Sequence, residues 1–505
     1  MTLPSPFRLR RGVGAVVTVL TLALPAAAQE LAFDTIRLDV DQADSIDAVD
    51  LNSDGHPDLL VGSGRTAMIF LYKADKGFAT KPDHTLIFGR DVFLWTAARF
   101  ADSDGLQLAV FSSRGIQRYP RTGPAAWGPA EDLIVAPNLF RGQAQEDAAP
   151  QRLDFLRDLD GDGLPEALYF VEESLWIFGQ DKDDAGRPRF RLRQKLPFPG
   201  ESELKTGWGP HHRLTQTVTV PLLVVGDVNE DKRLDLMYLR KESVGQFIQR
   251  ADGRFDVPKE GALSSERKKA RRHYIRFEAP PRVADFNGDG TLDVAVPDNF
   301  KYQARVEIYF NRRGRPDFTT PDAVLDHKDA WSSGIYVEDL DGDGLPEIIQ
   351  GVIPKFGVIG GIRAFMSGNI DVELHFHRLK KGTFTNEPTQ QVSLSIPYTF
   401  HATTDSATAD LKFWPQLKAD LNGDGLRDLI VASDDKELAV HFGKKDVLMS
   451  ATPEATISLN PPEHTASTKT YVADFNGDGR SDLVIRHDTT AKVSVIDVKL
   501  SRKTK

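Results

Sequence analysis

The chain has 505 residues, no cysteine and a formal net charge of −10 from 73 acidic and 63 basic residues. The acidic balance argues against a nucleic-acid partner, because phosphate binding requires clustered Lys and Arg. The absence of cysteine excludes disulfides and a thiol nucleophile, so the fold must be held by its core, by metal ions, or by both.

The first 28 residues have the pattern of a secretory signal peptide. Arginines at positions 8, 10 and 11 precede an apolar run at residues 12–24, and an Ala-Ala-Ala sequence ends at Ala28. This pattern predicts export with cleavage after Ala28, and loss of the three arginines takes the formal charge to −13. Later apolar runs are shorter than the roughly 18 residues of a membrane span. We therefore expect a secreted or periplasmic protein with no transmembrane segment after cleavage.

An acidic phrase of the form D-x-[DN]-x-D-G-x-x-[DE] recurs along the rest of the chain. Its copies begin at Asp50, Asp158, Asp227, Asp285, Asp339, Asp420 and Asp474. An eighth, degenerate copy, FADSDGLQL, occupies residues 100–108. Consecutive copies begin 50 to 81 residues apart, a spacing that indicates a structural repeat.

Each copy is followed by strand-like runs, such as DLLVGS and then AMIFLY, that are bounded by turn residues. Four short strands per unit are typical of β-propeller blades. The sequence therefore predicts an all-β protein in which residues 29–505 form one domain, an eight-bladed β-propeller. A seven-bladed ring is the alternative if the degenerate unit is not a blade. Only two strands follow the last acidic phrase, so we expect residues 31–40 to pair into the final blade and close the ring, which removes exposed sheet edges.

The acidic phrase itself suits a hard cation. In residues 285–293 the side chains of Asp285, Asn287, Asp289 and Asp293 and the carbonyl of Thr291 are oxygen ligands of the kind that Ca²⁺ prefers. Glycine at the sixth position permits the positive φ of a tight turn. An EF-hand is excluded, because position twelve is not acidic and strands flank the loop. An acidic turn without metal is the alternative, and seven equivalent loops argue against a catalytic carboxylate pair.

These loops and the strand pattern resemble the FG-GAP/VCBS repeats, which include the calcium-binding propeller of integrin α chains, although no Gly-Ala-Pro phrase accompanies the Phe-Gly pairs. The resemblance implies that each loop joins the first and second strands of a blade on one face and binds calcium, with the seventh residue contributing its carbonyl. Carried over by position, the sites are Asp50, Asn52, Asp54, His56 and Asp58; Asp158, Asp160, Asp162, Leu164 and Glu166; Asp227, Asn229, Asp231, Arg233 and Asp235; Asp285, Asn287, Asp289, Thr291 and Asp293; Asp339, Asp341, Asp343, Leu345 and Glu347; Asp420, Asn422, Asp424, Leu426 and Asp428; and Asp474, Asn476, Asp478, Arg480 and Asp482.

Two copies depart from the pattern and two exceed it. Lys232 replaces the sixth-position glycine of the third complete loop, which adds a repelling charge and a strained left-handed residue. The chain therefore has up to seven expected calcium sites, and the loop that begins at Asp227 either binds an ion or stays empty. The degenerate copy has Phe100 and Leu108 at its first and last ligand positions, so we expect it to bind no ion. The two DLDGDGLPE copies carry Asp160 and Asp341 where the other loops have Asn, and we expect them among the tighter sites.

Long insertions fall in the connections on the opposite face, at residues 134–153, 198–216, 262–278, 351–366 and 396–415. Loops on a rigid scaffold often carry function, and aromatic rings among polar groups suit the faces of sugars. A glycan, or an extracellular or envelope protein, is the expected partner. The candidate ligand-binding residues are Trp95, Trp208, His211, His212, Trp331 and Trp414. The alternative is that the tryptophans only pack between blades.

Two further patterns have both a functional and a plain interpretation. The run at residues 266–276 holds six Lys or Arg and suits an acidic polysaccharide, or is a solvated loop. Glu373, His375 and His377 alternate on one strand, a spacing that can hold a transition metal. A half-exposed outer strand explains the same pattern and is the favoured interpretation.

Signals for catalysis are few, and no catalytic residue or organic cofactor is predicted. The chain has no G-x-S-x-G, H-E-x-x-H or Walker sequence. Eight-bladed rhamnogalacturonan lyases resemble the same repeat family, so polysaccharide cleavage is the alternative to a binding module.

Overall fold

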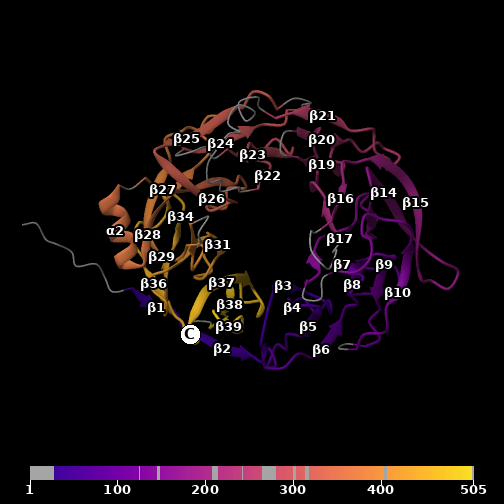
Figure 1. Ribbon diagram of the computed structural model, residues 1–505, viewed down its shortest axis with the longest axis horizontal. Coiled ribbons are helices and arrows are strands. Elements are labelled where there is room, and N and C mark those ends of the chain that lie inside the picture. Colours follow the sequence, from indigo (N-terminus) through magenta and orange to yellow (C-terminus); the bar gives the residue numbers. More distant parts are fainter. Residues whose placement is uncertain are drawn as a thin grey trace, which may run out of the picture.

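The computed structural model describes residues 28–123, 126–144, 148–206, 214–240, 243–263, 280–298, 303–312, 318–355, 357–402 and 407–502. Eight sheets stand around a common axis and form a ring (Figure 1). The all-β, eight-bladed propeller predicted from the spacing of the acidic phrases is confirmed, and the degenerate unit that begins at Phe100 is a blade.

Each blade has four antiparallel strands, of which the first lies nearest the axis and the fourth lies outermost (Figure 1). The strands of blades 1 to 4 are β3 (Ser45–Val49), β4 (Asp58–Ser63), β5 (Thr66–Phe70) and β6 (His84–Ile87); β7 (Val92–Arg99), β8 (Leu106–Ser112), β9 (Gly115–Tyr119) and β10 (Glu131–Val135); β12 (Leu156–Arg157), β13 (Glu166–Val171), β14 (Ser174–Lys182) and β15 (Pro188–Pro197); and β18 (Leu222–Gly226), β19 (Asp235–Leu239), β20 (Ser243–Phe247) and β21 (Lys259–Ala262).

Blades 5 to 8 follow the same plan. Their strands are β22 (Arg282–Ala284), β23 (Asp293–Pro297), β24 (Gln303–Tyr309) and β25 (Ala323–Lys328); β26 (Ala330–Glu338), β27 (Glu347–Pro354), β28 (Asn369–His377) and β29 (Gln390–Ala402); β31 (Gln416–Ala419), β32 (Asp428–Ala432), β33 (Glu437–His441) and β36 (Ala455–Ser458); and β37 (Thr465–Ala473), β38 (Asp482–Thr489), β39 (Ser494–Ser501) and β2 (Phe33–Leu38).

A few short elements extend this plan. They are β1 (Gln29–Glu30), parallel to β36; β11 (Gln151–Arg152), parallel to β7; the hairpin of β16 (Glu201–Thr206) and β17 (Leu214–Thr219) between blades 3 and 4; the helix α2 (Val358–Ser367) between β27 and β28; β30 (Ala407–Leu411), paired with the end of β29; and the hairpin of β34 (Gly443–Lys444) and β35 (Leu448–Met449).

The N-terminal strand closes the ring, as predicted from the sequence. β2 is the fourth strand of blade 8 and pairs antiparallel with β39, with Leu38 opposite Ile496. The guanidinium of Arg37 donates to both carboxylate oxygens of Asp497, at 2.7 and 2.8 Å. Blade 8 is therefore built from segments near both ends of the chain.

The core lies between neighbouring blades. Leu59, Leu60 and Val61 of β4 are at most 1% exposed, because blades cover both faces of the sheet. Leu59 and Val61 pack with residues of blade 8, whereas Leu60 packs with residues of blade 2. A strand buried on both faces has a continuous apolar sequence, which explains the run that follows each acidic loop.

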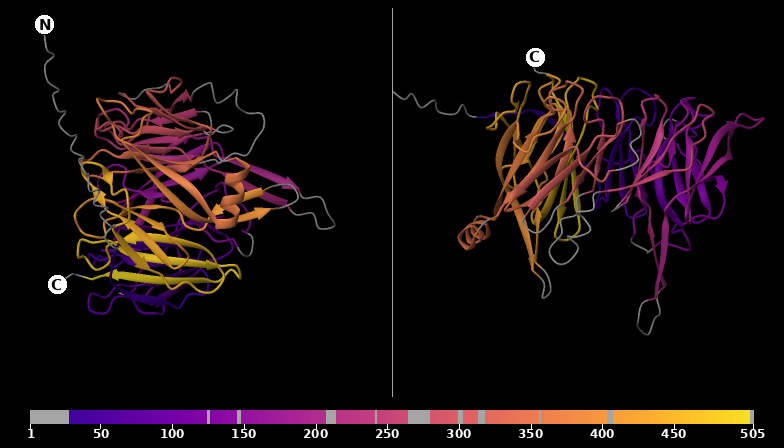
Figure 2. Two further views of the ribbon diagram at one scale, coloured as in Figure 1. Left: turned by 90° about the vertical axis from the view of Figure 1, so that its left-hand side faces the viewer. Right: turned by 90° about the horizontal axis from the view of Figure 1, so that it is seen from above.

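The connections divide between the two faces of the ring. The acidic loops join the first and second strands, and the last one lies beside the end of β39, where the hydroxyl of Ser501 donates to Asp478. The β16–β17 hairpin, the β29–β30 hairpin and α2 all project from the opposite face (Figure 2). Among the residues that the structure describes, no helix is long and apolar enough to cross a membrane.

Shortening a buried side chain of β2 tests the closure. Leu38 is 3% exposed and packs with Val498 and Leu500, so Leu38→Ala should lower the free energy of unfolding by about 2–5 kcal/mol. The exposed Thr35 of the same strand is the control, and Thr35→Ala should change the free energy by less than about 0.5 kcal/mol. Urea denaturation measures both, and equal small effects would show that β2 does not close the ring in solution.

Candidate metal centres

The seven acidic loops adopt one conformation, in which positions are numbered from the first Asp of each loop. In each of them the sixth backbone N–H donates to the first carboxylate at 2.7–3.1 Å. The seventh N–H donates to the fifth carboxylate at 2.8–2.9 Å. These bonds curl the backbone around the first, third and fifth side chains, which brings the expected oxygen ligands to one side of the loop.

Two residues of every loop have positive φ. The sixth residue has φ between 66° and 88°, as expected for its glycine, and the fourth has φ between 60° and 78°. The requirement at the fourth position was missed in the sequence analysis, although five of the seven loops have glycine there. The loop of blade 4 meets neither preference, because Glu230 and Lys232 take the two left-handed positions. This loop is therefore the most strained of the seven.

The ninth carboxylate ties each loop to its blade. These seven residues are at most 2% exposed: Asp58, Glu166, Asp235, Asp293, Glu347, Asp428 and Asp482. One oxygen accepts the N–H of the second loop residue at 2.7–3.0 Å. In the five aspartate loops the other oxygen accepts an N–H at or just beyond the end of the third strand, such as that of Asn311 at 2.7 Å.

Burial makes these carboxylates costly to ionise. It raises the pKa of Asp58 and Asp235 to about 6, raises that of Glu166, Asp293, Glu347 and Asp428 to about 7, and raises that of Asp482. Backbone N–H groups oppose the rise, and the other aspartates of the loop, such as Asp285 and Asp289 beside Asp293, add to it. A buried acid in acidic surroundings favours a cation beside it, so the residues present fit a bound Ca²⁺.

Three loops bring carboxylate oxygens of three residues within 4.8 Å of one another. They are Asp158, Asp160 and Glu166; Asp227, Asp231 and Asp235; and Asp339, Asp341 and Glu347. The strained loop of blade 4 is thus among those whose acids converge, and Arg233 donates to its Asp231.

The two DLDGDGLPE loops each have an arginine that the sequence analysis missed. Arg193 of β15 lies 2.6 Å from Asp160 and 3.1 Å from Glu166. Arg378, just after β28, contacts Asp341 and lies 3.4 Å from Glu347. Each guanidinium offsets the negative charge of the additional aspartate and therefore opposes the binding of a cation in these two loops. That they bind calcium more tightly than the other loops stays a prediction.

The degenerate loop of blade 2 has a cation of its own. The guanidinium of Arg118 donates to both oxygens of Asp102, at 2.6 and 2.8 Å, and to Glu131 at 2.9 Å. Its side chain is 4% exposed and lies 5.4 Å from the ring centre of Phe100. An arginine from β9 thus pairs with Asp102 of this loop and with Glu131 at the start of β10.

The candidate ligand-binding residues differ in their surroundings. Trp95 is 3% exposed in the core between blades 1 and 2, Trp331 is partly buried against the core of blades 6 and 7, and Trp414 is 51% exposed. Of these, Trp414 alone offers a largely open ring. Trp208, His211, His212 and the whole basic run at residues 266–276 lie outside the described residues.

The favoured interpretation of the pattern Glu373-His375-His377 is wrong. β28 is the third strand of its blade, and His375 and His377 are 7% and 1% exposed. Both side chains lie beside His327 of β25, so that ring nitrogens of the three lie within 4.8 Å of one another. The sequence analysis did not connect His327 with the other two, because it lies 48 residues before His375.

The raised pKa values predict an unusual dependence of stability on pH in the metal-free protein. Asp293 keeps its proton to about pH 7 in the folded state but to about pH 4 in the unfolded state. Its contribution to stability is complete below about pH 4 and is lost as the pH rises through 7, by at most about 1.4 kcal/mol per pH unit.

Urea denaturation of calcium-free protein between pH 4 and 8 measures this slope. Asp293→Asn should flatten it, whereas Asp104→Asn in the exposed part of the degenerate loop should not. Identical slopes in all three proteins would contradict the account of the ninth carboxylate.

Comparisons with known proteins agree with the fold. The FG-GAP-like repeat family matches residues 227–296, 285–349 and 420–485, and each match spans two acidic loops. No curated protein matches the sequence.

Similar solved structures include an Agrocybe aegerita lectin described as recognising non-reducing terminal N-acetylglucosamine, with 15% identity over 85% of this chain and 86% of that one and a TM-score of 0.36. Others are the Dos1 propeller (8% identity, 93% and 95% coverage, TM-score 0.40) and the V. cholerae biofilm matrix protein Bap1 (11%, 94% and 88%, 0.29). At these identities and TM-scores the likenesses carry no argument about function. The chain is an eight-bladed β-propeller that contains FG-GAP-like repeats.

Proposed function

We propose that the protein is an exported, calcium-stabilised β-propeller that acts as a binding module, with a glycan bound on the face opposite the acidic loops. The observation that carries the proposal is the repetition of one loop conformation with a buried ninth carboxylate in seven blades. A catalytic role needs one set of acids, whereas seven equivalent sets at the same place in each blade suit a structural cation.

Calcium is the cation that this arrangement favours. All side-chain atoms expected to bind the ion are carboxylate or amide oxygens, and Ca²⁺ takes six to eight oxygen ligands in flexible geometry. Sites as weak as about 10⁻⁴ to 10⁻³ M suffice outside the cell, where the signal sequence would deliver the protein. Each ion would hold the first strand of a blade to the second through the ninth carboxylate, and in the five aspartate loops it would also hold the third strand.

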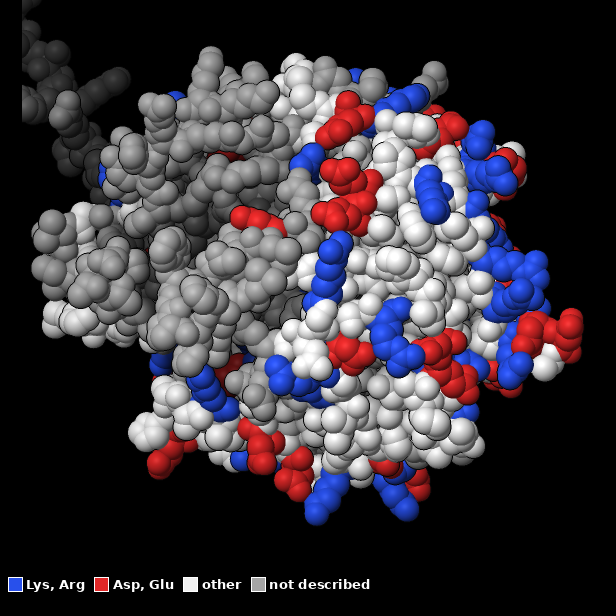
Figure 3. All heavy atoms as spheres, turned by 45° about the vertical axis from the view of Figure 1, so that its right-hand side comes forward, with Lys and Arg blue, Asp and Glu red and all other residues white. Residues whose placement is uncertain are grey.

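The opposite face offers the surface for a partner. Phe365 and Met366 of α2 are 75% and 81% exposed, and Trp414 between β30 and β31 is 51% exposed. Two residues before Trp414, the ammonium of Lys412 lies 3.2 Å from Asp435. On the side of the ring that carries β14 and β15, acidic and basic side chains are interspersed (Figure 3), which argues against a charged partner there.

Removal of calcium should destabilise the protein. At ten times its dissociation constant, each ion should add about 1.4 kcal/mol to the free energy of unfolding. Asp289→Asn removes a charge at the fifth position of a complete loop. The increase in the free energy of unfolding caused by calcium should therefore be smaller by the contribution of one site. Asp104→Asn changes the fifth position of the degenerate loop and should keep the full increase.

Thermal unfolding with calcium and with excess EDTA measures the effect for the wild type and both variants. A melting temperature that is unchanged by EDTA would refute calcium stabilisation.

A glycan array with and without calcium tests the ligand class. Trp414→Ala should weaken binding at least tenfold, because it removes the exposed ring. Val257→Ala, which is 72% exposed on the connection between β20 and β21 beside the acidic loops, should leave binding unchanged.

A blank array would refute the glycan as ligand. The release of unsaturated products from pectin-type polymers, followed by absorbance, would favour the lyase instead of the binding module.

A further inference from the structure

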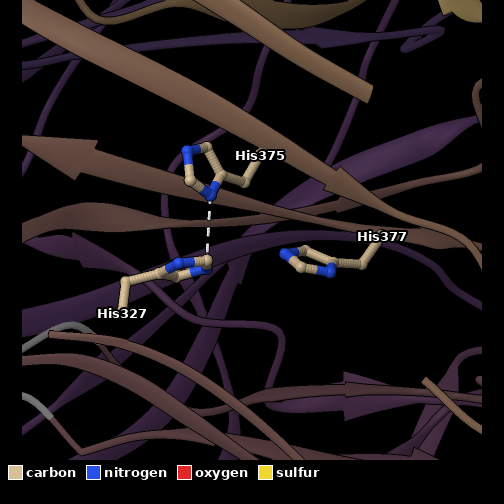
Figure 4. A group of neighbouring side chains, drawn as sticks. All are labelled: His327, His375 and His377. Carbon is tan, nitrogen blue, oxygen red and sulfur yellow. Dashed lines mark hydrogen bonds between the residues drawn. The ribbon is translucent and has the colours of Figure 1, made fainter. Parts of the chain in front are cut away.

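Three imidazole rings meet at the interface between blades 5 and 6. His327 comes from β25, and His375 and His377 come from β28, where alternate residues share a face (Figure 4). That face is turned toward blade 5, because Ile348, which is opposite His377 in the sheet, packs with Leu325 and Ile308 of blade 5. The three rings therefore face one another across the blade boundary.

The hydrogen bonds of His377 leave its Nε2 free to bind. Its Nδ1 lies 3.0 Å from the carbonyl oxygen of Thr385, which only accepts, so Nδ1 carries the proton. A neutral ring with its proton on Nδ1 has its lone pair on Nε2. Nε2 is buried and has no hydrogen-bond partner among the described residues, a state that is unfavourable for a polar atom and that a bound ion would relieve.

A hydrogen bond also determines which ring nitrogen of His375 carries the proton, and here the acceptor is a carboxylate. Its Nε2 lies 3.0 Å from Oε2 of Glu373 and donates to it, which leaves the lone pair on Nδ1. Nδ1 lies 3.2 Å from Nε2 of His327. Two nitrogens that are each about 2.0–2.1 Å from a tetrahedral Zn²⁺ lie about 3.3 Å apart. A histidine held by a carboxylate through its other nitrogen is the usual surrounding of a metal ligand.

The repeat itself marks this interface as different. Position twelve of each complete unit faces the preceding blade, and in blade 6 it is Gln350, fully buried opposite His375 and beside His327. The equivalent residues of the other six complete units are apolar or aromatic: Val61, Tyr169, Tyr238, Val296, Val431 and Ile485. Polar side chains thus replace part of the apolar core between blades 5 and 6.

We propose that His327, His375 and His377 bind one divalent transition metal ion, with Zn²⁺ as the best match, that joins blades 5 and 6. Imidazole nitrogens suit Zn²⁺ and its neighbours in the first transition series, whereas Ca²⁺ prefers oxygen. The site is independent of the acidic loops in both its ligands and its place in the ring. Gln350 or a water fills the fourth position, and Glu373 is a positioning residue.

The test uses the mature chain with excess Ca²⁺, so that the acidic loops are occupied. Zn²⁺ is titrated in competition with a chromophoric chelator, and Co²⁺ is titrated while the visible absorption of a nitrogen-bound tetrahedral ion is recorded. We expect one equivalent of each ion. His327→Gln and His377→Gln should each weaken binding at least tenfold and remove the Co²⁺ band, and Glu373→Gln should weaken it about 10- to 100-fold.

His441→Gln is the matched control. His441 ends the third strand of blade 7 as His377 ends that of blade 6, is 3% exposed, and has Nδ1 2.9 Å from the carbonyl oxygen of Ser450. It should keep full zinc affinity. Circular dichroism identifies variants that do not fold, and the half-buried position of His327 makes His327→Gln the safer variant.

The proposal is overturned if the wild type binds no more Zn²⁺ than the variant that carries both His327→Gln and His377→Gln. It is equally overturned if Co²⁺ gives no band, or if the control loses affinity as the site variants do.

Discussion

Each complete blade depends on one buried carboxylate at the base of its sheet. The ninth loop residue, such as Asp293, accepts one backbone N–H from its own loop, and in the aspartate loops a second from the end of the third strand. It thereby joins three strands at a place that water does not reach. The same burial raises the pKa of Asp293 to about 7, because the ionised carboxylate is unfavourable there. A cation held by the loop would stabilise the ionised carboxylate and with it the folded state.

Because this arrangement is repeated in seven blades, the two faces of the ring differ. One face is acidic, uniform and suited to oxygen-binding cations, whereas the insertions on the other face differ from blade to blade. Blade 2 lacks the full set of acids, and there Arg118 forms ion pairs with Asp102 of the loop and with Glu131 of β10. Blade 6 departs in another way, with three clustered histidines at its boundary with blade 5.

Much of this could be predicted from the sequence, because the features are local or periodic. The spacing of the acidic phrases predicts eight blades, and the missing fourth strand of the last unit predicts closure by β2. The features that could not be predicted join segments far apart in the chain. Arg193 contacts Asp160 from another strand, and His327 meets His375 only because their blades are neighbours. The buried state of β28 was also missed, since alternating polar residues resemble an exposed strand.

The central claim is that the repeated loop is a calcium site. The most direct measurement is the number of calcium ions per chain, determined by elemental analysis after equilibrium dialysis at saturating calcium. The account predicts close to seven ions per wild-type chain and one fewer for each loop that loses its first aspartate. A wild-type chain that retains no calcium, or an unchanged number after Asp285→Ala, would contradict it.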